Sequence, residues 1–65
     1  MTQNEQILSL LKRGPLTQLE ALDKVGTTRL AARINDLREL GHIIHTEPVT
    51  KGNKTYARYH LIQEK

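Results

Sequence analysis

Residues 27–41 read TTRLAARINDLRELG, and their pattern decides the fold that we expect for the rest of the chain. Leu30, Ile34 and Leu37 recur at spacings of three and four residues, which places them on one apolar face of an α-helix. Small side chains let a helix approach a groove of DNA, arginines donate to guanine edges or phosphates, and hydroxyl groups reach either. We therefore predict a recognition helix whose outward residues are Thr28, Arg29, Ala32, Arg33, Asp36 and Glu39.

The chain has 65 residues, which predicts one small domain, residues 1–65, with a thin core. It contains no cysteine, which excludes disulfides and Cys-based zinc or iron–sulfur sites. Its histidines, His42, His45 and His60, remain as candidate ligands. No apolar run has the length of a signal-peptide core or a membrane span, so we expect a cytoplasmic protein that does not enter a membrane.

The basic charge is concentrated in the second half of the chain. The formal net charge is +3 and the pI is about 9.6. Residues 24–60 carry seven Lys and Arg against three Asp and Glu, whereas residues 1–23 carry two against three. A polyanionic partner is the natural inference, although an excess of this size also occurs in proteins that bind nothing charged.

Two helices are expected before residue 27. Residues 4–13 contain aliphatic side chains at helical spacing, and Gly14-Pro15 stops that helix. Thr17 and Glu20 match a capping box, in which the Thr17 hydroxyl accepts from the Glu20 amide and the Glu20 carboxylate accepts from the Thr17 amide. A second helix is therefore predicted to begin there.

This second helix is expected to bury Leu19, Leu22 and Val25 and to end at Gly26, a residue type that terminates helices in the left-handed conformation. Thr27 or Thr28 would cap the third helix, leaving a connection of about three residues. Helices joined by so short a turn cross steeply, which predicts a helix-turn-helix over about residues 17–40.

Beyond Gly41 the apolar pattern changes from helical to alternating, and Gly52-Asn53 predicts a two-residue turn in a hairpin over about residues 43–62. Pro48 lacks an amide donor, which predicts that its strand is either an edge strand or carries a bulge there. Residues 63–65 are expected to be frayed. The predicted pairs are Lys51–Lys54, Val49–Tyr56, Glu47–Arg58, Thr46–Tyr59, Ile44–Leu61 and Ile43–Ile62. The face toward the helices would hold Ile44, Thr46, Ala57, Tyr59 and Leu61.

Three helices followed by a basic-tipped, two-stranded hairpin predict an α+β, winged helix-turn-helix fold. The sequence also resembles small helix-turn-helix proteins of bacteriophages and prophages, which carry the pattern L-x-A-L-x-x-x-G-x-x-R-L-A-A-R-I-x-D-L-R-x-x-G. Here the pattern runs from Leu19 to Gly41, and Ala57-Arg58-Tyr59 follows in the last strand, so the similarity covers nearly the whole chain. The resemblance implies a winged-helix DNA-binding fold and a prokaryotic or phage setting, and it supplies no pathway.

Candidate DNA contacts lie in the third helix and at the hairpin tip. Arg29 and Arg33 are one turn apart, in reach of the major groove. The alternative is that both are ordinary surface arginines, with Arg33 in an ion pair with Asp36. Asp36 would otherwise orient an arginine or accept from a cytosine amino group. The full set of candidates is Thr27, Thr28, Arg29, Arg33, Asp36, Lys51, Asn53 and Lys54.

The remaining candidates also have structural alternatives. Thr27 and Thr28 are expected to reach phosphates, although capping alone explains one of them. Lys51 and Lys54 are placed as phosphate contacts, whereas Asn53 is either a base reader or simply a turn residue.

His45 and His60 face each other in the predicted register, outward and beside Glu47. Without a convincing third ligand we expect solvated histidines, with no metal and no cofactor.

No catalytic constellation is visible, so we do not expect an enzyme. We expect a protein that binds double-stranded DNA with sequence preference, as a transcriptional regulator or as an architectural factor in excision or integration. A single short groove contact calls for a homodimer or tandem copies on DNA. The alternative is a winged-helix module that docks on a host or phage protein, which an exposed apolar patch would favour.

Overall fold

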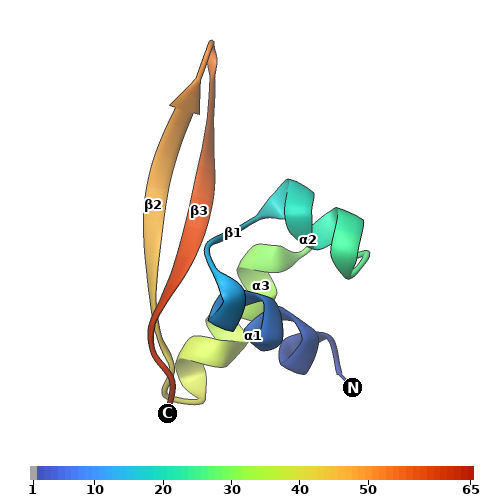
Figure 1. Cartoon of the computed structure of the whole chain (residues 1–65), viewed down its shortest axis with the longest axis vertical. Coiled ribbons are helices and arrows are strands. Elements are labelled where there is room, and N and C mark those ends of the chain that lie inside the picture. The colour runs from blue at the N-terminus through green and yellow to red at the C-terminus, as the bar shows by residue number, and fades with distance from the viewer. Residues whose placement is uncertain (1) are drawn as a thin grey trace.

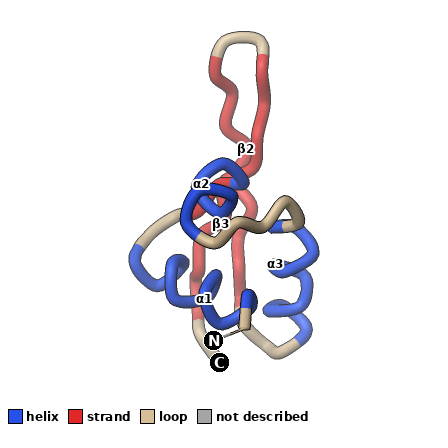
Figure 2. Tube along the Cα trace, turned by 90° about the vertical axis from the view of Figure 1, so that its right-hand side faces the viewer, coloured by secondary structure: helices blue, strands red, loops and turns tan. Residues whose placement is uncertain are grey.

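The computed structural model describes residues 2–65, and it contains three helices and a three-stranded antiparallel sheet (Figure 1). The body of the molecule is formed by the helices and the lower half of a long hairpin, and the upper half of the hairpin extends beyond them (Figure 2). The elements are α1 (Gln3–Arg13), β1 (Leu16–Thr17), α2 (Gln18–Lys24), α3 (Leu30–Glu39), β2 (Ile43–Lys51) and β3 (Lys54–Gln63).

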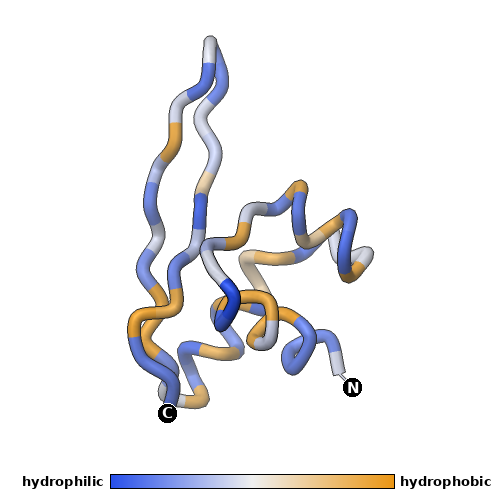
Figure 3. Tube along the Cα trace, viewed as in Figure 1, coloured by the Kyte–Doolittle hydropathy of each residue, from blue (hydrophilic) through white to orange (hydrophobic). Residues whose placement is uncertain are grey.

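The core lies where α1 and α3 meet the lower part of the hairpin, and Figure 3 shows the apolar segments gathered there. Leu30, Ile34 and Leu37 are buried, which confirms the predicted apolar face of the third helix. The other buried apolar side chains are Ile7, Leu11, Leu16, Ala21 and Ile44. Tyr59 and Leu61 of β3 are partly buried against this cluster, so every helix and every strand contributes to one small core.

Side-chain contacts occur near both ends of residues 2–65. The Thr2 hydroxyl accepts from the Glu5 amide at 3.2 Å and Glu5 bonds back to Thr2, so a capping box starts α1 at Gln3, one residue earlier than predicted. The predicted fraying of residues 63–65 is wrong. Gln63 belongs to β3, and the Glu64 carboxylate lies 2.6 Å from the Lys12 ammonium of α1.

The second helix begins at Gln18 as predicted, and Val25 is partly buried against the core as predicted, but the predicted burial of Leu19 and Leu22 is wrong. Leu19 is 77% exposed and Leu22 is 46% exposed, whereas Ala21 is buried. With only seven residues, α2 contacts the body along a narrow strip, and Leu16, just before it, fills the core instead. The helix therefore presents two leucines to solvent.

The capping of α2 also differs in detail from the prediction. The Thr17 hydroxyl accepts from the Glu20 amide at 3.3 Å as expected, but the Glu20 carboxylate accepts from that hydroxyl and not from the Thr17 amide. Thr17 is part of β1, which pairs with β3 opposite Arg58. This two-residue strand was not predicted, and it attaches the start of α2 to the sheet.

Residues 25–29 connect α2 to α3, so the turn is longer than the three residues predicted. Gly26 has φ +84°, which confirms the left-handed residue at the end of α2. Neither Thr27 nor Thr28 caps α3, which begins at Leu30. The capping group comes from α2: the Gln18 carboxamide accepts from the Leu30 amide at 3.1 Å and donates to the Thr27 carbonyl at 2.7 Å.

The hairpin has the predicted register from Lys51–Lys54 to Ile44–Leu61. The last predicted pair is wrong, because a bulge between Ile43 and Ile44 brings Ile43 opposite Gln63. The turn contains Gly52 with φ +63°, and Asn53 has a negative φ. A two-residue hairpin of this kind closes on a hydrogen-bonded pair, here Lys51 and Lys54.

The strand order β1-β3-β2 makes β2 an edge strand, which is one of the two predictions for Pro48. Because hydrogen-bonded pairs alternate along an antiparallel ladder, Pro48 and Ile44 direct their backbone polar positions to the open edge. Pro48 has no amide to leave unpaired there. The Ile44 carbonyl accepts from Arg38 Nη2 at 2.8 Å and from Arg38 Nε at 3.2 Å, so α3 covers part of the edge.

Replacing Gln18 by Met should destabilise the protein, because it removes two part-buried hydrogen bonds while keeping the side chain's length. Two such bonds contribute about 1–3 kcal/mol to the free energy of unfolding. The measurement is urea unfolding followed by circular dichroism. The control is Gln6→Met in the exposed part of α1, where no side-chain hydrogen bond is lost among residues 2–65. Equal stabilities of the two variants would contradict this role of Gln18.

Candidate nucleic-acid interface

The outer face of α3 is polar and is built around small side chains. Ala31 and Asn35 are exposed and Ala32 is partly exposed, on the side of the helix opposite the buried stripe. Ala31 and Asn35 are not among the outward residues predicted from the sequence. Thr28 precedes the helix, and its exposed side chain lies at the start of this face. Neutral short side chains leave the helix backbone accessible to a groove-sized partner.

Thr27 does not lie on this surface. Its side chain is only 3% exposed, and its hydroxyl accepts from the Arg29 amide at 3.1 Å. The predicted phosphate contact of Thr27 is therefore unsupported, because the hydroxyl is turned into the turn between α2 and α3. The same bond fixes the backbone of Arg29, whose exposed side chain forms no ion pair among the described residues.

Arg33 and Asp36 form an ion pair, with Arg33 Nη2 lying 3.2 Å from Asp36 Oδ2. This is the surface pairing that the sequence analysis kept as the alternative for Arg33. Arg33 Nε is buried without a hydrogen-bond partner in residues 2–65, so the guanidinium lies partly against the protein. Arg33 is on the flank of the outer face, closer to the core than Asn35.

Lys51 and Lys54 are paired across the hairpin and are both exposed beside the Gly52-Asn53 turn. The hairpin tip lies at one end of the long axis of the molecule, well beyond the helices (Figure 1). Figures 1 and 2 show that the start of α3 faces this end of the body, whereas its last turn lies at the opposite end. The start of α3 and the basic tip thus lie toward the same end of the long axis of the molecule.

Four of the ten lysines and arginines are occupied within the protein. Lys12, Arg33 and Arg58 form ion pairs, and Arg38 binds the Ile44 carbonyl and the Thr46 hydroxyl. The six cations whose side chains form neither an ion pair nor a hydrogen bond within residues 2–65 are Arg13, Lys24, Arg29, Lys51, Lys54 and Lys65. Three of these six lie at the start of α3 or at the hairpin tip.

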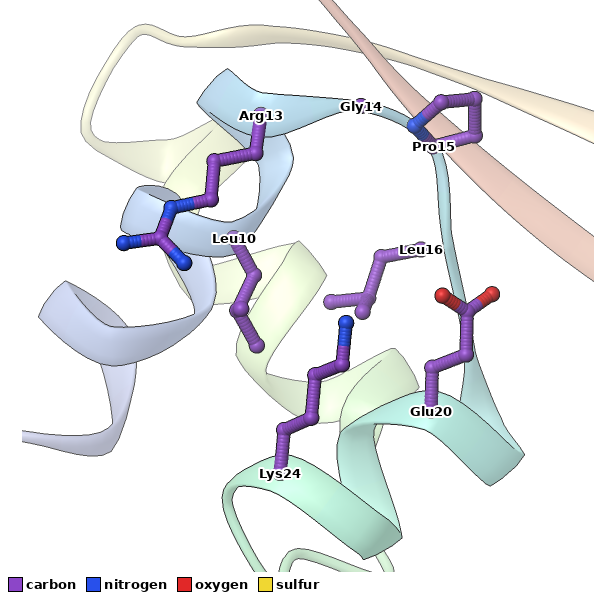
Figure 4. Close-up of a pocket in the computed structure, with 7 residues that line it drawn as sticks. All are labelled: Leu10, Arg13, Gly14, Pro15, Leu16, Glu20 and Lys24. Carbon is purple, nitrogen blue, oxygen red and sulfur yellow. The ribbon is translucent and has the colours of Figure 1, made fainter.

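A small cleft of about 190 Å³ lies between α1, β1 and α2 (Figure 4). Arg13 and Lys24 line it together with the apolar side chains of Leu10 and Leu16, and Lys24 extends toward both. Sites for small molecules usually measure about 300–1,000 Å³. The cleft is therefore too small to suggest a site for a substrate or cofactor.

The outer face of the hairpin carries a charged cluster between the tip and the body. Glu47 Oε1 lies 2.8 Å from His60 Nε2 and 3.6 Å from Arg58 Nη1, which confirms the predicted Glu47–Arg58 pairing. The His45 and His60 rings face each other at 6.2 Å. The hydrogen bond from His60 lowers the pKa of Glu47 against a smaller opposing effect of burial, and the charges of His60, Arg58 and His45 lower it further. Among residues 2–65, no three His, Cys, Asp or Glu side chains are placed to hold a metal ion.

The whole arrangement matches a known family. The family model described as a winged helix-turn-helix domain matches residues 2–64 of the chain. The chain belongs to the winged helix-turn-helix domain family. In this winged helix-turn-helix domain, α2 and α3 form the helix-turn-helix and the β2–β3 hairpin is the wing.

Comparison with curated proteins and with solved structures gives no significant match. Winged helix-turn-helix domains are typically DNA-binding, so the family supports a DNA-binding type for this chain. None of the helices in residues 2–65 is long and apolar enough to span a membrane.

Replacing Glu47 by Gln should reduce stability at neutral pH and have less effect in acid. Because the pKa of Glu47 is lowered from its ordinary value of 4.5, the ionised carboxylate stabilises the fold above that pH, and the contribution is lost as the pH falls through the folded-state pKa. Urea unfolding of wild type and variant from about pH 7 to about pH 3 measures this. The control is Glu39→Gln on α3, which loses no ion pair among the described residues. A stability difference that does not change with pH would contradict the role of the ionised carboxylate.

Proposed function

We propose that this winged helix-turn-helix domain binds double-stranded DNA with sequence preference, placing the outer face of α3 in the major groove. The observation that carries the proposal is the composition of the first part of that face: the short, neutral side chains of Ala31, Ala32 and Asn35, preceded by Arg29, which forms no ion pair among residues 2–65. Such a face lets the backbone approach base edges while a guanidinium reaches a phosphate or a guanine. The residues that we propose to contact DNA are Thr28, Arg29, Asn53 and the Arg33–Asp36 pair. Lys51 and Lys54 are proposed to contact the phosphate backbone of the DNA.

The wing supplies the second part of the proposed contact. Lys51 and Lys54 are the nearest cations to the hairpin tip, and neither is neutralised by an acidic side chain in the described chain. A wing that follows the phosphate backbone would place both ammonium groups near phosphates. Together with α3, this gives around five phosphate contacts and a slope of about −4 to −5 for log K against log salt concentration.

The biological role that we propose is that of a phage-type transcriptional regulator or an architectural factor in excision or integration, acting in the cytoplasm of a prokaryotic host. Both roles need the same DNA-binding surface. A domain with one recognition helix makes a single short groove contact, so we propose that two copies bind together, either as a homodimer or side by side on DNA. We propose a binding protein and not an enzyme.

Fluorescence anisotropy with a random-sequence duplex across a salt series tests the proposal. We expect roughly micromolar binding at low salt that weakens steeply as salt is added. No binding at low salt would overturn the proposed function, because counterion release contributes to nearly all DNA binding.

Replacing Lys51 and Lys54 together by alanine should reduce the magnitude of the salt slope by about 2, since each phosphate contact contributes about 0.9. The same anisotropy series measures it. The matched control is Lys12→Ala, because Lys12 already pairs with Glu64 on the other side of the domain. A slope equal to that of wild type would remove the wing from the proposed interface.

A second candidate function is docking on another protein, and the exposed pair Leu19 and Leu22 favours it. These leucines are three residues apart on one side of α2, and Asp23, which forms no ion pair in the described chain, lies next to them. The partner that fits would present a small apolar surface beside a basic group. Absence of duplex binding in the salt series would leave docking as the better explanation of the fold.

Replacing Leu19 and Leu22 together by Gln should change the free energy of unfolding by less than about 1 kcal/mol, because Leu19 is mostly in water and Leu22 is about half exposed. Duplex binding should also stay at the wild-type level if α2 docks a protein and α3 binds DNA. Urea unfolding and anisotropy measure the two quantities. The control is Leu16→Gln in the buried core, which should unfold the domain. A large loss of stability in the double variant would contradict the orientation of α2.

A further inference from the structure

Asn35 is the polar side chain at the centre of the outer face of α3. It follows Ala31 and Ala32 at helical spacing and lies opposite the buried stripe that contains Ile34. The two alanines come one turn earlier on the same side, so nothing longer than a methyl group stands between Asn35 and the start of the helix. A short side chain at such an exposed position can reach base edges if the helix enters the major groove.

Asn35 has no structural role in the fold of residues 2–65. Within residues 2–65 its carboxamide forms no hydrogen bond, and it neither caps a helix nor fills the core. Asparagine is a poor helix former in a helix interior, because its side chain competes with the backbone for hydrogen bonds. Its neighbours behave differently, since Arg33 and Asp36 bind each other. The carboxamide is therefore a free donor and a free acceptor on an exposed face.

We propose that Asn35 determines specificity by reading an adenine in the major groove. Adenine presents the N7 acceptor and the N6 amino donor side by side there, and a carboxamide matches this pair with one donor and one acceptor. Guanine presents two acceptors at the same place, and pyrimidines present neither arrangement, so only adenine satisfies both groups. The proposal rests on the proposed function, because it assigns one base contact within the same DNA interface.

The pairing of Arg33 with Asp36 supports this assignment. An arginine that reads guanine needs its guanidinium free for a bidentate contact, and the Asp36 carboxylate already occupies Arg33 Nη2. The pair instead borders the outer face beside Asn35. The pair carries little net charge, and the Asn35 carboxamide beside it offers a donor and an acceptor that no side chain among residues 2–65 engages.

The experiment first selects a preferred duplex with the wild-type chain from a random pool and then measures affinity for each single base change in it. We expect one adenine whose replacement weakens wild-type binding roughly tenfold to a hundredfold. The Asn35→Ala variant should bind the parent duplex more weakly by the same factor and should no longer distinguish the bases at that position. Replacing that adenine by 7-deazaadenine should weaken wild-type binding and leave Asn35→Ala unaffected.

Two controls separate this base contact from general binding. Asn35→Ala should keep the salt slope and the affinity of wild type for random-sequence DNA, because no charge is changed. Glu39→Gln, at the end of the same helix, should keep the adenine preference. An Asn35→Ala variant that retains the preference at every position would overturn the assignment of Asn35 while leaving the proposed function intact. A wild-type chain that binds no duplex at low salt would overturn both.

Discussion

The carboxamide of Gln18 is the interaction on which the geometry of the outer surface depends. It accepts from the first amide of α3 and donates to the Thr27 carbonyl, so one side chain joins α2, the connecting turn and α3. Gly26 supplies the left-handed backbone that lets the chain reverse there, and the Thr27 hydroxyl then holds the Arg29 amide. Because a helix that starts without a side-chain cap of its own is otherwise free to fray, this bridge determines where the outer face of α3 begins.

Each side of α3 has a separate role in the molecule. Leu30, Ile34 and Leu37 anchor the helix in the core, and Arg38 extends from a neighbouring side to bind β2. The remaining side is left to solvent and carries no apolar side chain larger than alanine. Because α3 is anchored on two sides, its solvent-facing side is held in a fixed position. A surface that distinguishes base sequences needs such fixed geometry.

The parts of the fold that were predicted from the sequence are those encoded by local signals. The apolar period of α3, the turn at Gly52 and the strand register all follow from residues near one another in the chain. The interaction of Gln18 with Leu30 spans twelve residues, and β1 has only two residues, so neither leaves a periodic signal. The orientation of α2 was wrong because seven residues with leucines at two positions fit more than one face. On the candidate surface, Arg33 was predicted as a DNA contact and Asn35 was not. The ion pair of Arg33 and the exposure of Asn35 both depend on how α3 is oriented against the core, which the sequence alone does not give.

The covered edge of β2 has a consequence for the behaviour of the protein in solution. A hairpin that extends far from its core is a template for strand addition, and long open edges promote aggregation. Arg38 occupies the Ile44 carbonyl, and Pro48 offers no amide, so the ladder of free donors and acceptors along β2 is interrupted at two places. These two interruptions make the β2 edge of the wing a poorer template for adding a strand from another molecule.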